Sequence, residues 1–469
     1  MKDDAFMQQV PKIQPPLDAA FRPAALAHRA FSARAAASGH SVAARLALEQ
    51  ADGSVFHFNA PLFPDNSPGA AANFFCVERL IKFLLWSRGG YRVYFDGPAT
   101  LGRQLQQYFR ETATGKFDAN IMGERIYGHP FEIVVTKDIP AARANTTPLG
   151  RHLEGCRIGF DLGASDRKAA ALVDGKVVFS EELGWNPVPQ TDPQWHFDHI
   201  MESLKRAAQH LPRVDAIGGS SAGVYINNRV RVASLFRGVP PAAFDKRVKD
   251  LFLELKAAWG GIPFEVVNDG EVTALAGSMA LGENAVLGIA LGSSQAAGFV
   301  TPEGNITSWL NELAFAPIDY NPSAPVDEWS GDRGCGVQYF SQQCVGRLLA
   351  PAGIEAPASE PLPEKLRRVQ QLMEKGDARA EKIYQTIGVY LGYGVAHYAD
   401  FYDIKHVLIL GRATTGRGGE IIVRRAQEVL KAEFPELSSR IVFDVPDEKE
   451  KRHGQAIAAA SLPMLKAKV

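Results

Sequence analysis

Apolar residues recur along the chain at two spacings, and their succession predicts an α/β protein. Short apolar or alternating runs bounded by Gly, Asp or Asn are typical of strands, and apolar positions three and four residues apart are typical of helices. From residue 156 onward the order is three strands, then helix, strand, helix, strand and helix. The predicted strands lie at 157–161, 168–173, 176–182, 214–219 and 264–267, and the predicted helices at 194–209, 244–259 and directly after 267.

The remainder of the chain repeats this scheme. The predicted strands there are 285–291, 295–300, 406–410 and 440–445, and the predicted helices are 337–349, 363–375, 377–402, 419–434 and 454–466. Two similar α/β halves predict a cleft between them, which is a favoured place for a ligand.

The first 150 residues differ from the rest of the chain in composition and in their pattern of apolar positions. Residues 1–45 are rich in Ala, Pro and Arg and are expected to form a mobile or loosely packed arm with a short helix at 23–37. A hairpin at 43–60, helices at 71–86 and 101–110 and strands at 91–95 and 131–135 follow. The predicted domains are therefore 1–150, an arm with a small α/β domain; 151–283; and 284–469, whose last helix can pack back on 151–283.

Composition narrows the function classes. The chain has 469 residues, 46% hydrophobic and 22% charged, with a net charge of −1. Such a balance gives no global basic field that favours nucleic acid or an anionic membrane. The most apolar stretch, 71–86, contains Glu78, Arg79 and Lys82, and the N-terminus has no secretory pattern. We therefore expect a cytoplasmic protein with no membrane or nucleic-acid partner.

The four cysteines, Cys76, Cys156, Cys335 and Cys344, form no CxxC pair and no His-Cys cluster with zinc spacing. They are expected to be free thiols packed in the interior. His196 and His199 share a helical face, but without a third ligand a packed pair is expected there.

The most informative segment is 264–282, in which a buried-strand pattern runs directly into Asn268-Asp269 and then into a helix rich in small residues. A carboxylate at a strand end can act as a general base toward a substrate hydroxyl. Asn and Asp are also favoured helix N-caps, so a purely structural role for Asp269 is the alternative.

Three glycine turns occupy corresponding places around this segment, at Gly163, Gly292 and Gly411. Glycine lets a backbone approach a ligand closely, and exposed N–H groups can hold phosphate oxygens. Each turn alone is typical of a tight hairpin, whereas the ordered set around Asp269 indicates a nucleotide site.

With these motifs the chain resembles the ROK family of sugar kinases and repressors, within the actin/hexokinase/Hsp70 superfamily, over about residues 157–462. The segments that carry the resemblance are Ile158-Gly-Phe-Asp-Leu-Gly163, Ile217-Gly-Gly-Ser-Ser-Ala-Gly-Val224, Val267-Asn-Asp269, Leu291-Gly292, Gly334-Cys335 with Tyr339 and Ser341, and Leu410-Gly411. The resemblance implies two ribonuclease-H-like (actin-like ATPase) lobes around a cleft, with the small N-terminal α/β domain added.

The resemblance also implies roles for individual residues. Asp269 is expected to be the general base, with Asn268, Gly223 and Glu312 binding the sugar and Asp161 near Mg²⁺, which it would contact through water. The residues expected to bind ATP are Gly163, Ser165, Lys168, Gly292, Ser293 and Ser294 at the phosphates, and Gly411, Arg412 and Thr414 near the adenosine. ATP and Mg²⁺ are the expected cofactors, and a homodimer is a further expectation.

The chain departs from the family pattern at several of these places. Phe315 stands where a zinc-binding His is expected, Val337 where a second sugar-binding Glu is expected, and only Cys335 of the cysteine cluster is present, so no structural zinc is expected. Asp166 repels phosphate unless Arg167 or Lys168 offsets its charge. Two hypotheses follow: a sugar kinase, or a non-catalytic sugar or nucleotide sensor that acts through a protein partner. Residues 1–150 show no helix-turn-helix, which disfavours DNA binding.

Overall fold

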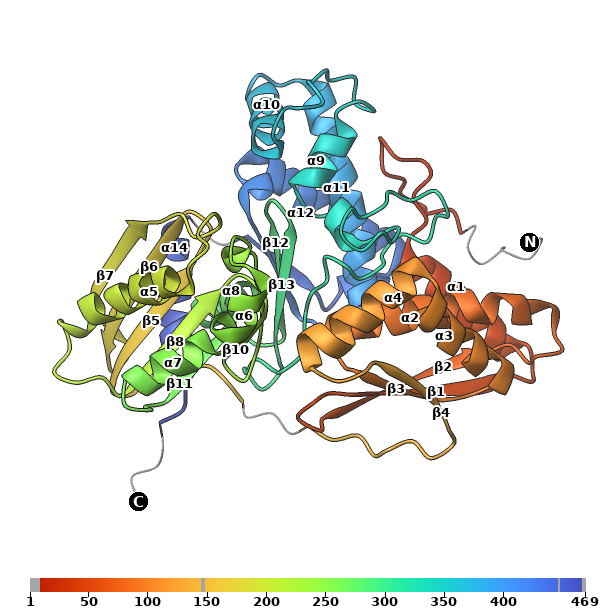
Figure 1. The fold of residues 1–469 in the computed structure, drawn as a ribbon. Coiled ribbons are helices and arrows are strands. Elements are labelled where there is room, and N and C mark those ends of the chain that lie inside the picture. The colour runs from red at the N-terminus through yellow and green to blue at the C-terminus, as the bar shows by residue number, and fades with distance from the viewer. Residues whose placement is uncertain (1–8, 145–147, 446–447, 466–469) are drawn as a thin grey trace. The chain divides into compact units, whose positions relative to one another are not determined.

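The computed structural model describes residues 9–144, 148–445 and 448–465, with the side chains of 448–453 left aside (Figure 1). Contacts group the chain into two compact units. Unit 1 comprises Met1–Thr146, Ile289–Ala297 and Trp309–Val445, and unit 2 comprises Thr147–Gly288, Gly298–Ser308 and Pro446–Val469. The division passes through strands β12 (Val286–Leu291) and β13 (Gln295–Val300). The division into three domains remains a prediction.

Unit 2 is built on a five-stranded sheet of order β11-β8-β5-β6-β7. Its strands are β5 (Cys156–Leu162), β6 (Asp166–Val173), β7 (Lys176–Gly184), β8 (Ala216–Ser221) and β11 (Phe264–Asn268). The strands β5, β8 and β11 run parallel, whereas β5, β6 and β7 form an antiparallel meander. The predicted strands of this region are confirmed, and the parallel strands read as continuous apolar runs because both faces of the sheet are covered.

Successive residues of β6 show the two covered faces. Ala169 and Ala171 belong to the core that contains Ile200 of α5 (Pro193–Ala208), whereas Ala170 and Leu172 pack with α14 (Glu448–Ala460). The approach of α14 depends on two glycines: a Cβ atom at Gly159 would lie 1.8 Å from the Ala456 carbonyl oxygen, and one at Gly218 would lie 1.7 Å from that of Ala459. The last helix therefore packs on the sheet of unit 2.

Two details of unit 2 differ from the sequence prediction. The single helix expected at 244–259 is broken into α6 (Pro241–Lys246) and α7 (Leu251–Ala258), because Arg247 leaves the helical conformation at φ −131°. A hairpin of β9 (Val224–Ile226) and β10 (Arg229–Val232) was not predicted. Its turn residues Asn227 and Asn228 both have positive φ, the geometry of a primed hairpin turn.

The N-terminal sheet of unit 1 has the order β2-β1-β3-β4. Its strands are β1 (Val42–Glu49), β2 (Val55–Leu62), β3 (Arg92–Asp96) and β4 (Glu132–Val135), and its helices are α1 (Ala24–Ala37), α2 (Asn73–Arg88), α3 (Ala99–Glu111) and α4 (Ala113–Asn120). The register pairs Glu49 with Val55 across the predicted turn, so the hairpin prediction is confirmed. Helix α4 was not predicted.

Residues 17–35 pack against the rest of unit 1, so the prediction of a loosely packed arm is wrong for this part of the segment. The ring of Phe21 lies 4.8 Å from that of Tyr390 on α11 (Ala378–Tyr398), and the Leu17 N–H donates to Thr386 Oγ1 at 3.2 Å. The Ala24 N–H donates to the Ile318 carbonyl oxygen at 2.8 Å. Although the segment is rich in Ala and Pro, its few large side chains are anchored on α11, and this pattern could not be seen in its average composition.

The second sheet of the C-terminal half has the order β13-β12-β14-β15, with β14 at His406–Leu410 and β15 at Val442–Asp444. The remaining helices of this region are α9 (Gln342–Leu348), α10 (Leu362–Glu374), α12 (Arg417–Glu433) and α13 (Pro435–Ser438). The helix expected at 337–349 begins only at Gln342, because the Ser341 hydroxyl caps it by accepting from the Gln343 N–H at 3.0 Å.

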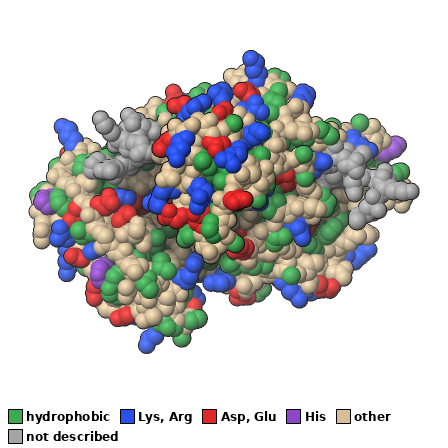
Figure 2. Space-filling view, turned by 90° about the horizontal axis from the view of Figure 1, so that it is seen from above, with side chains coloured by type: hydrophobic (Ala, Val, Ile, Leu, Met, Phe, Trp, Pro, Cys, Tyr) green, Lys and Arg blue, Asp and Glu red, His purple; other side chains and the backbone are tan. Residues whose placement is uncertain are grey.

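Acidic and basic side chains are interspersed over the face of the molecule shown in Figure 2, in keeping with the net charge of −1. None of the helices in the described part of the chain combines the length and the apolar character that a membrane span requires.

Candidate active site

The carboxyl ends of three parallel strands meet at one edge of the unit 2 sheet. The register places Asp161 of β5 beside Ser220 of β8, and Ser221 beside Asn268 of β11. Asp269 follows Asn268 and is the first residue of α8 (Asp269–Leu281). This edge is where open α/β sheets bind ligands, because the loops there can diverge from the strands.

The helix cap at this edge is Asn268 rather than Asp269. The Asn268 Oδ1 atom accepts from the Gly270 N–H at 2.7 Å, and its Nδ2 atom donates to the Gly223 carbonyl oxygen, also at 2.7 Å. The Asp269 carboxylate lies 3.0 Å from the same Gly270 nitrogen. Asn268 thus accounts for the helix start, and Asp269 has no need to serve as the N-cap.

Burial, and after it the negative charge of Asp161, raise the pKa of Asp269 to about 6, although the Gly270 N–H favours the ionised form. Asp269 as a whole residue is only partly buried. A pKa just below neutral pH suits a general base, because the group is ionised and still binds a proton well.

Asp161 is buried, with 6% of its surface exposed. Its Oδ1 atom accepts from the Ser220 hydroxyl at 2.6 Å, and its Oδ2 atom lies 3.7 Å from the Lys168 ammonium. Burial raises the pKa of Asp161, and both partners oppose that shift by stabilising its charge. The charge of Asp161 therefore acts on Asp269, and the Lys168 cation lies beside Asp161.

Lys168 and Arg167 lie on opposite faces of β6. Lys168 also lies 3.1 Å from Asp166, so it offsets the charge that this aspartate brings to the first turn. Arg167 is buried and donates to Ser203 of α5 at 2.7 Å and to Glu202 at 2.6 Å. Of the two cations considered from sequence, Lys168 is the one at the candidate site.

The first glycine turn is closed by its own backbone. The Gly163 N–H donates to the Asp166 carbonyl oxygen at 2.9 Å, and the Trp185 indole N–H donates to the Gly163 carbonyl oxygen at 2.8 Å. Ser165 is exposed, and its hydroxyl donates to the Asp166 carboxylate at 3.0 Å. The turn is thus a tight hairpin, with Ser165 as its exposed hydroxyl.

The other two glycine turns belong to unit 1 and lie next to each other there. The Gly292 N–H donates to the Ser294 carbonyl oxygen at 3.0 Å, and Ser293 and Ser294 are exposed. A Cβ atom at Gly411, where φ is +98°, would lie 2.5 Å from the Leu291 carbonyl oxygen. Gly411 is therefore required by the close approach of β14 to the end of β12, whatever it binds.

Thr414 is buried and donates from its hydroxyl to the Gly411 carbonyl oxygen at 2.8 Å, whereas Arg412 is exposed. Glu312, also in unit 1, is half-buried, and its N–H donates to the Trp86 carbonyl oxygen at 2.9 Å. The structure thus places Asp161, Gly163, Ser165, Lys168, Gly223, Asn268 and Asp269 in unit 2, and the remaining predicted residues in unit 1. Binding roles for all of them remain predictions.

Sequence reasoning overlooked Tyr225 and Ser221. The Ser221 and Tyr225 hydroxyl oxygens are 2.6 Å apart, and the charge of Asp269 contributes to the raised pKa of Tyr225, whose main cause is burial. Ser220 and Ser221 lie in the Gly-Gly-Ser-Ser-Ala-Gly stretch that also contains Gly223. The signal that the sequence offered for them was a buried strand that ends in polar residues.

The surroundings of Cys335 do not suit a metal thiolate. Cys335 is fully buried in an apolar cluster with Ala314 and Val337, against which Phe315 packs. Burial raises the pKa of its thiol to about 12. His196, in unit 2, is held by backbone carbonyl oxygens, including that of Asp192 at 3.2 Å, as expected for a packed histidine.

No family model matches the chain, and no curated protein matches it in sequence. Solved structures of similar fold include the ROK hexokinase from Thermus thermophilus, with a TM-score of 0.52 and 19% identity over 65% of this chain and 96% of that one. A ROK family transcriptional regulator, a homologue of the E. coli Mlc protein, aligns with a TM-score of 0.51 and 18% identity over 66% of this chain and 79% of that one. An enzyme and a regulator therefore match equally well. The resemblance inferred from the motifs is confirmed as a likeness of fold: about two thirds of this chain adopts the α/β fold of ROK family proteins.

Proposed function

We propose that the protein transfers the γ-phosphoryl group of ATP to a hydroxyl group of a sugar or sugar-like substrate, with Asp269 as the general base. The observation that carries this proposal is the position of Asp269, a partly exposed residue at the start of α8 whose carboxyl group has its pKa raised to about 6. The helix does not need Asp269 as its cap, because the Asn268 side chain already caps it. The fold shared with a hexokinase adds support at the level of architecture.

In the proposed reaction Asp269 accepts the proton of the substrate hydroxyl as its oxygen forms a bond to the γ-phosphorus. The bond between that phosphorus and the oxygen of ADP breaks, and ADP leaves with the electron pair. Phosphoryl transfer demands mainly positioning and neutralisation of charge, so one base and a few cationic or N–H groups can suffice. Asn268 retains one N–H that could hold a sugar hydroxyl beside Asp269, and Gly223 and Glu312 are the further proposed sugar contacts.

The donor set at the strand ends fits magnesium, which prefers oxygen ligands and keeps several of its waters. Asp161 would hold the ion through water, and the ion would neutralise charge on the phosphates. Lys168 would turn from Asp161 toward a phosphate oxygen, and Ser165 would add a hydroxyl donor. Gly163, Gly292, Ser293 and Ser294 are the further proposed phosphate contacts, and Gly411, Arg412 and Thr414 the proposed adenosine contacts.

A second function is favoured by one specific observation. The Lys168 ammonium already pairs with Asp161 at 3.7 Å and with Asp166 at 3.1 Å, so a cation of the chain occupies the place where magnesium is expected to act. In a non-catalytic sugar or nucleotide sensor this pairing would be permanent. Such a sensor would report ligand binding to a protein partner.

Release of ADP, measured with Mg-ATP against a panel of sugars, tests the kinase. The wild-type protein is expected to turn over at least one sugar, and Asp269→Asn is expected to lower kcat about 10²- to 10⁴-fold, the usual contribution of a general base. Asp245→Asn is the matched control, because Asp245 is an exposed acid paired with Lys249 on the surface of the same unit. Undiminished turnover in Asp269→Asn would rule out the mechanism. Calorimetric binding of a sugar without binding of Mg-ATP would identify the sensor instead.

A further inference from the structure

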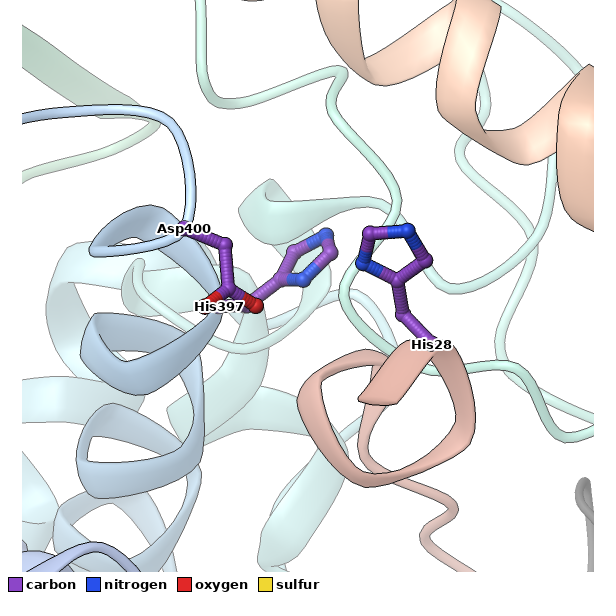
Figure 3. Close-up of side chains that lie close together, drawn as sticks. All are labelled: His28, His397 and Asp400. Carbon is purple, nitrogen blue, oxygen red and sulfur yellow. The ribbon is translucent and has the colours of Figure 1, made fainter. Parts of the chain in front are cut away.

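Two histidines and an aspartate from distant parts of the chain converge in unit 1. His28 lies on α1, His397 lies in the last turn of α11, and Asp400 follows that helix. One nitrogen of each imidazole and one carboxylate oxygen all lie within 4.8 Å of one another. Figure 3 shows the two rings directed toward each other from their separate helices, with Asp400 beside His397.

The imidazole nitrogens in this cluster lack the partners that buried polar atoms normally have. Both nitrogens of His397 and the Nδ1 atom of His28 are buried without a hydrogen-bond partner among the described residues. Leaving such groups unsatisfied in the interior is costly, so each one calls for an explanation. A bound ion would satisfy one nitrogen of each ring at once.

Aromatic rings line most of the rest of the cluster, and one of them, the Tyr320 ring, lies 6.4 Å from the His397 ring. The Phe83 and Phe401 rings lie 4.7 and 5.3 Å from the His397 ring, and the Phe401 ring also stacks on His28. The two phenylalanine rings offer no alternative hydrogen bonds. Burial lowers the pKa of both histidines, which keeps the imidazoles in the neutral form that binds metals.

Arg29 holds Asp400 in place through both carboxylate oxygens, and its Nε atom donates to Oδ2 at 3.4 Å. The Arg29 Nη2 atom donates to its Oδ1 atom at 2.8 Å, and Arg29 also pairs with Glu436 at 3.0 Å. An ionised carboxylate can accept about four hydrogen bonds, so lone pairs remain for another ligand. Arg29 therefore orients the carboxylate, as outer groups around metal sites commonly do. Asp400 is partly exposed, which leaves a path for an ion to enter.

We propose that His28, His397 and Asp400 bind a divalent first-row transition metal ion such as Zn²⁺, with water completing the coordination. Two imidazole nitrogens and one carboxylate oxygen suit such an ion, whereas Ca²⁺ and Mg²⁺ prefer oxygen ligands alone. Zinc bonds of about 2.0–2.1 Å place tetrahedral ligands roughly 3.4 Å apart, so the ligand atoms, which lie within 4.8 Å of one another, approach by up to about 1.4 Å on binding. The ion joins α1 to α11, so binding stabilises the packing of the N-terminal helix. No cysteine takes part in this site.

Calorimetric titration of ZnCl₂ into the full-length protein, first treated with EDTA, tests the proposal. One tight site per chain is expected, together with a rise in Tm at saturating zinc. His28→Gln and Asp400→Asn are each expected to weaken binding at least 10-fold, the size of effect usual at metal sites, and to abolish the rise in Tm. His40→Gln, which changes an exposed histidine, is expected to alter neither quantity.

Titration with CoCl₂ supplies a second readout, since Co²⁺ bound in a low-symmetry nitrogen and oxygen site gives visible absorption. That absorption is expected in the wild type and in His40→Gln and is expected to be absent in His28→Gln. A protein without a tight zinc site, or one whose zinc affinity is unchanged in His28→Gln, would overturn the proposal. His28 lies outside the fully buried core, so His28→Gln is expected to fold.

Discussion

The Lys168 ammonium lies 3.7 Å from the Asp161 carboxylate and 3.1 Å from that of Asp166, at the edge of the sheet where Asp269 begins its helix. The positive charge of Lys168 therefore offsets the negative charges of Asp161 and Asp166, which a phosphate ligand has to approach. Under the proposed kinase function, Lys168 exchanges these partners for a phosphate oxygen when the nucleotide binds. Under the sensor function it keeps them.

Lys168→Met separates these two cases. In a kinase, the substitution is expected to raise KM for ATP about 10-fold or more while changing the affinity for the sugar little, because a charged partner of the phosphate is lost. Steady-state kinetics with ATP and sugar varied separately measure both effects. Lys176→Met, at an exposed position of β7, is the control. Unchanged kinetics in Lys168→Met would remove Lys168 from the phosphate site.

The raised pKa of Asp269 predicts the pH dependence of activity. The base acts in its ionised form, so kcat/KM is expected to fall about tenfold per pH unit below the pKa of about 6 and to be level above it. A pH profile of kcat/KM checks this. A profile that stays level down to pH 4.5 would show that Asp269 does not have the raised pKa or is not the base.

The same shift predicts an effect of Asp269 on stability. The folded state holds the proton up to about pH 6, whereas an ordinary aspartate has a pKa of 3.8, so the ionisation of Asp269 costs stability as pH rises through that window. Asp269→Asn is therefore expected to raise the free energy of unfolding more at pH 8 than at pH 5, by about 1 kcal/mol. Urea denaturation at both pH values measures the difference. An equal effect at the two pH values would contradict a raised pKa.

A buried charge network in unit 1 predicts a strong effect of Lys82. Its ammonium lies 2.9 Å from Asp118 and 2.7 Å from Asp332, and Lys82 and Asp118 are fully buried. Lys82→Met leaves the buried Asp118 carboxylate without its cation and Asp332 with Arg79 alone at 2.9 Å, which is expected to cost about 3–5 kcal/mol. Urea denaturation measures the loss, with Lys116→Met at an exposed position of α4 as control. A loss below about 1 kcal/mol would mean that Arg79 and water suffice.

Gly411 and Gly416 make a matched pair for the third turn. Both have positive φ, but a Cβ atom at Gly411 would lie 2.5 Å from the Leu291 carbonyl oxygen, whereas one at Gly416 would meet nothing within 4 Å. Gly416→Ala is expected to cost about 1 kcal/mol from backbone strain alone. Gly411→Ala is expected to cost clearly more, with a lower Tm measured without nucleotide. Equal losses of stability in the two variants would show that the backbone of β12 can shift to make room for the added Cβ atom.

The elements that sequence patterns predicted well are those governed by local spacing. The order of strands and helices after residue 156 follows from periodicity, and so does the turn between β1 and β2, because neighbouring residues alone fix which face of an element is apolar. The β9–β10 hairpin was missed although Asn227-Asn228 between alternating apolar residues is a recognisable turn signal. The packing of Phe21 on α11 was beyond the reach of such patterns, since its partners lie more than 300 residues away.

The sequence by itself determined the α/β character of the chain and the place of Asp269 at a strand end before a helix. The tertiary structure decided the rest: that Asn268 is the cap, that Lys168 and not Arg167 lies beside Asp161, that Lys82 is buried between two aspartates, and that His28 meets His397. The reason is physical. Periodicity records which side of an element avoids water, whereas burial, pKa and ion pairing depend on segments that folding brings together from distant parts of the chain.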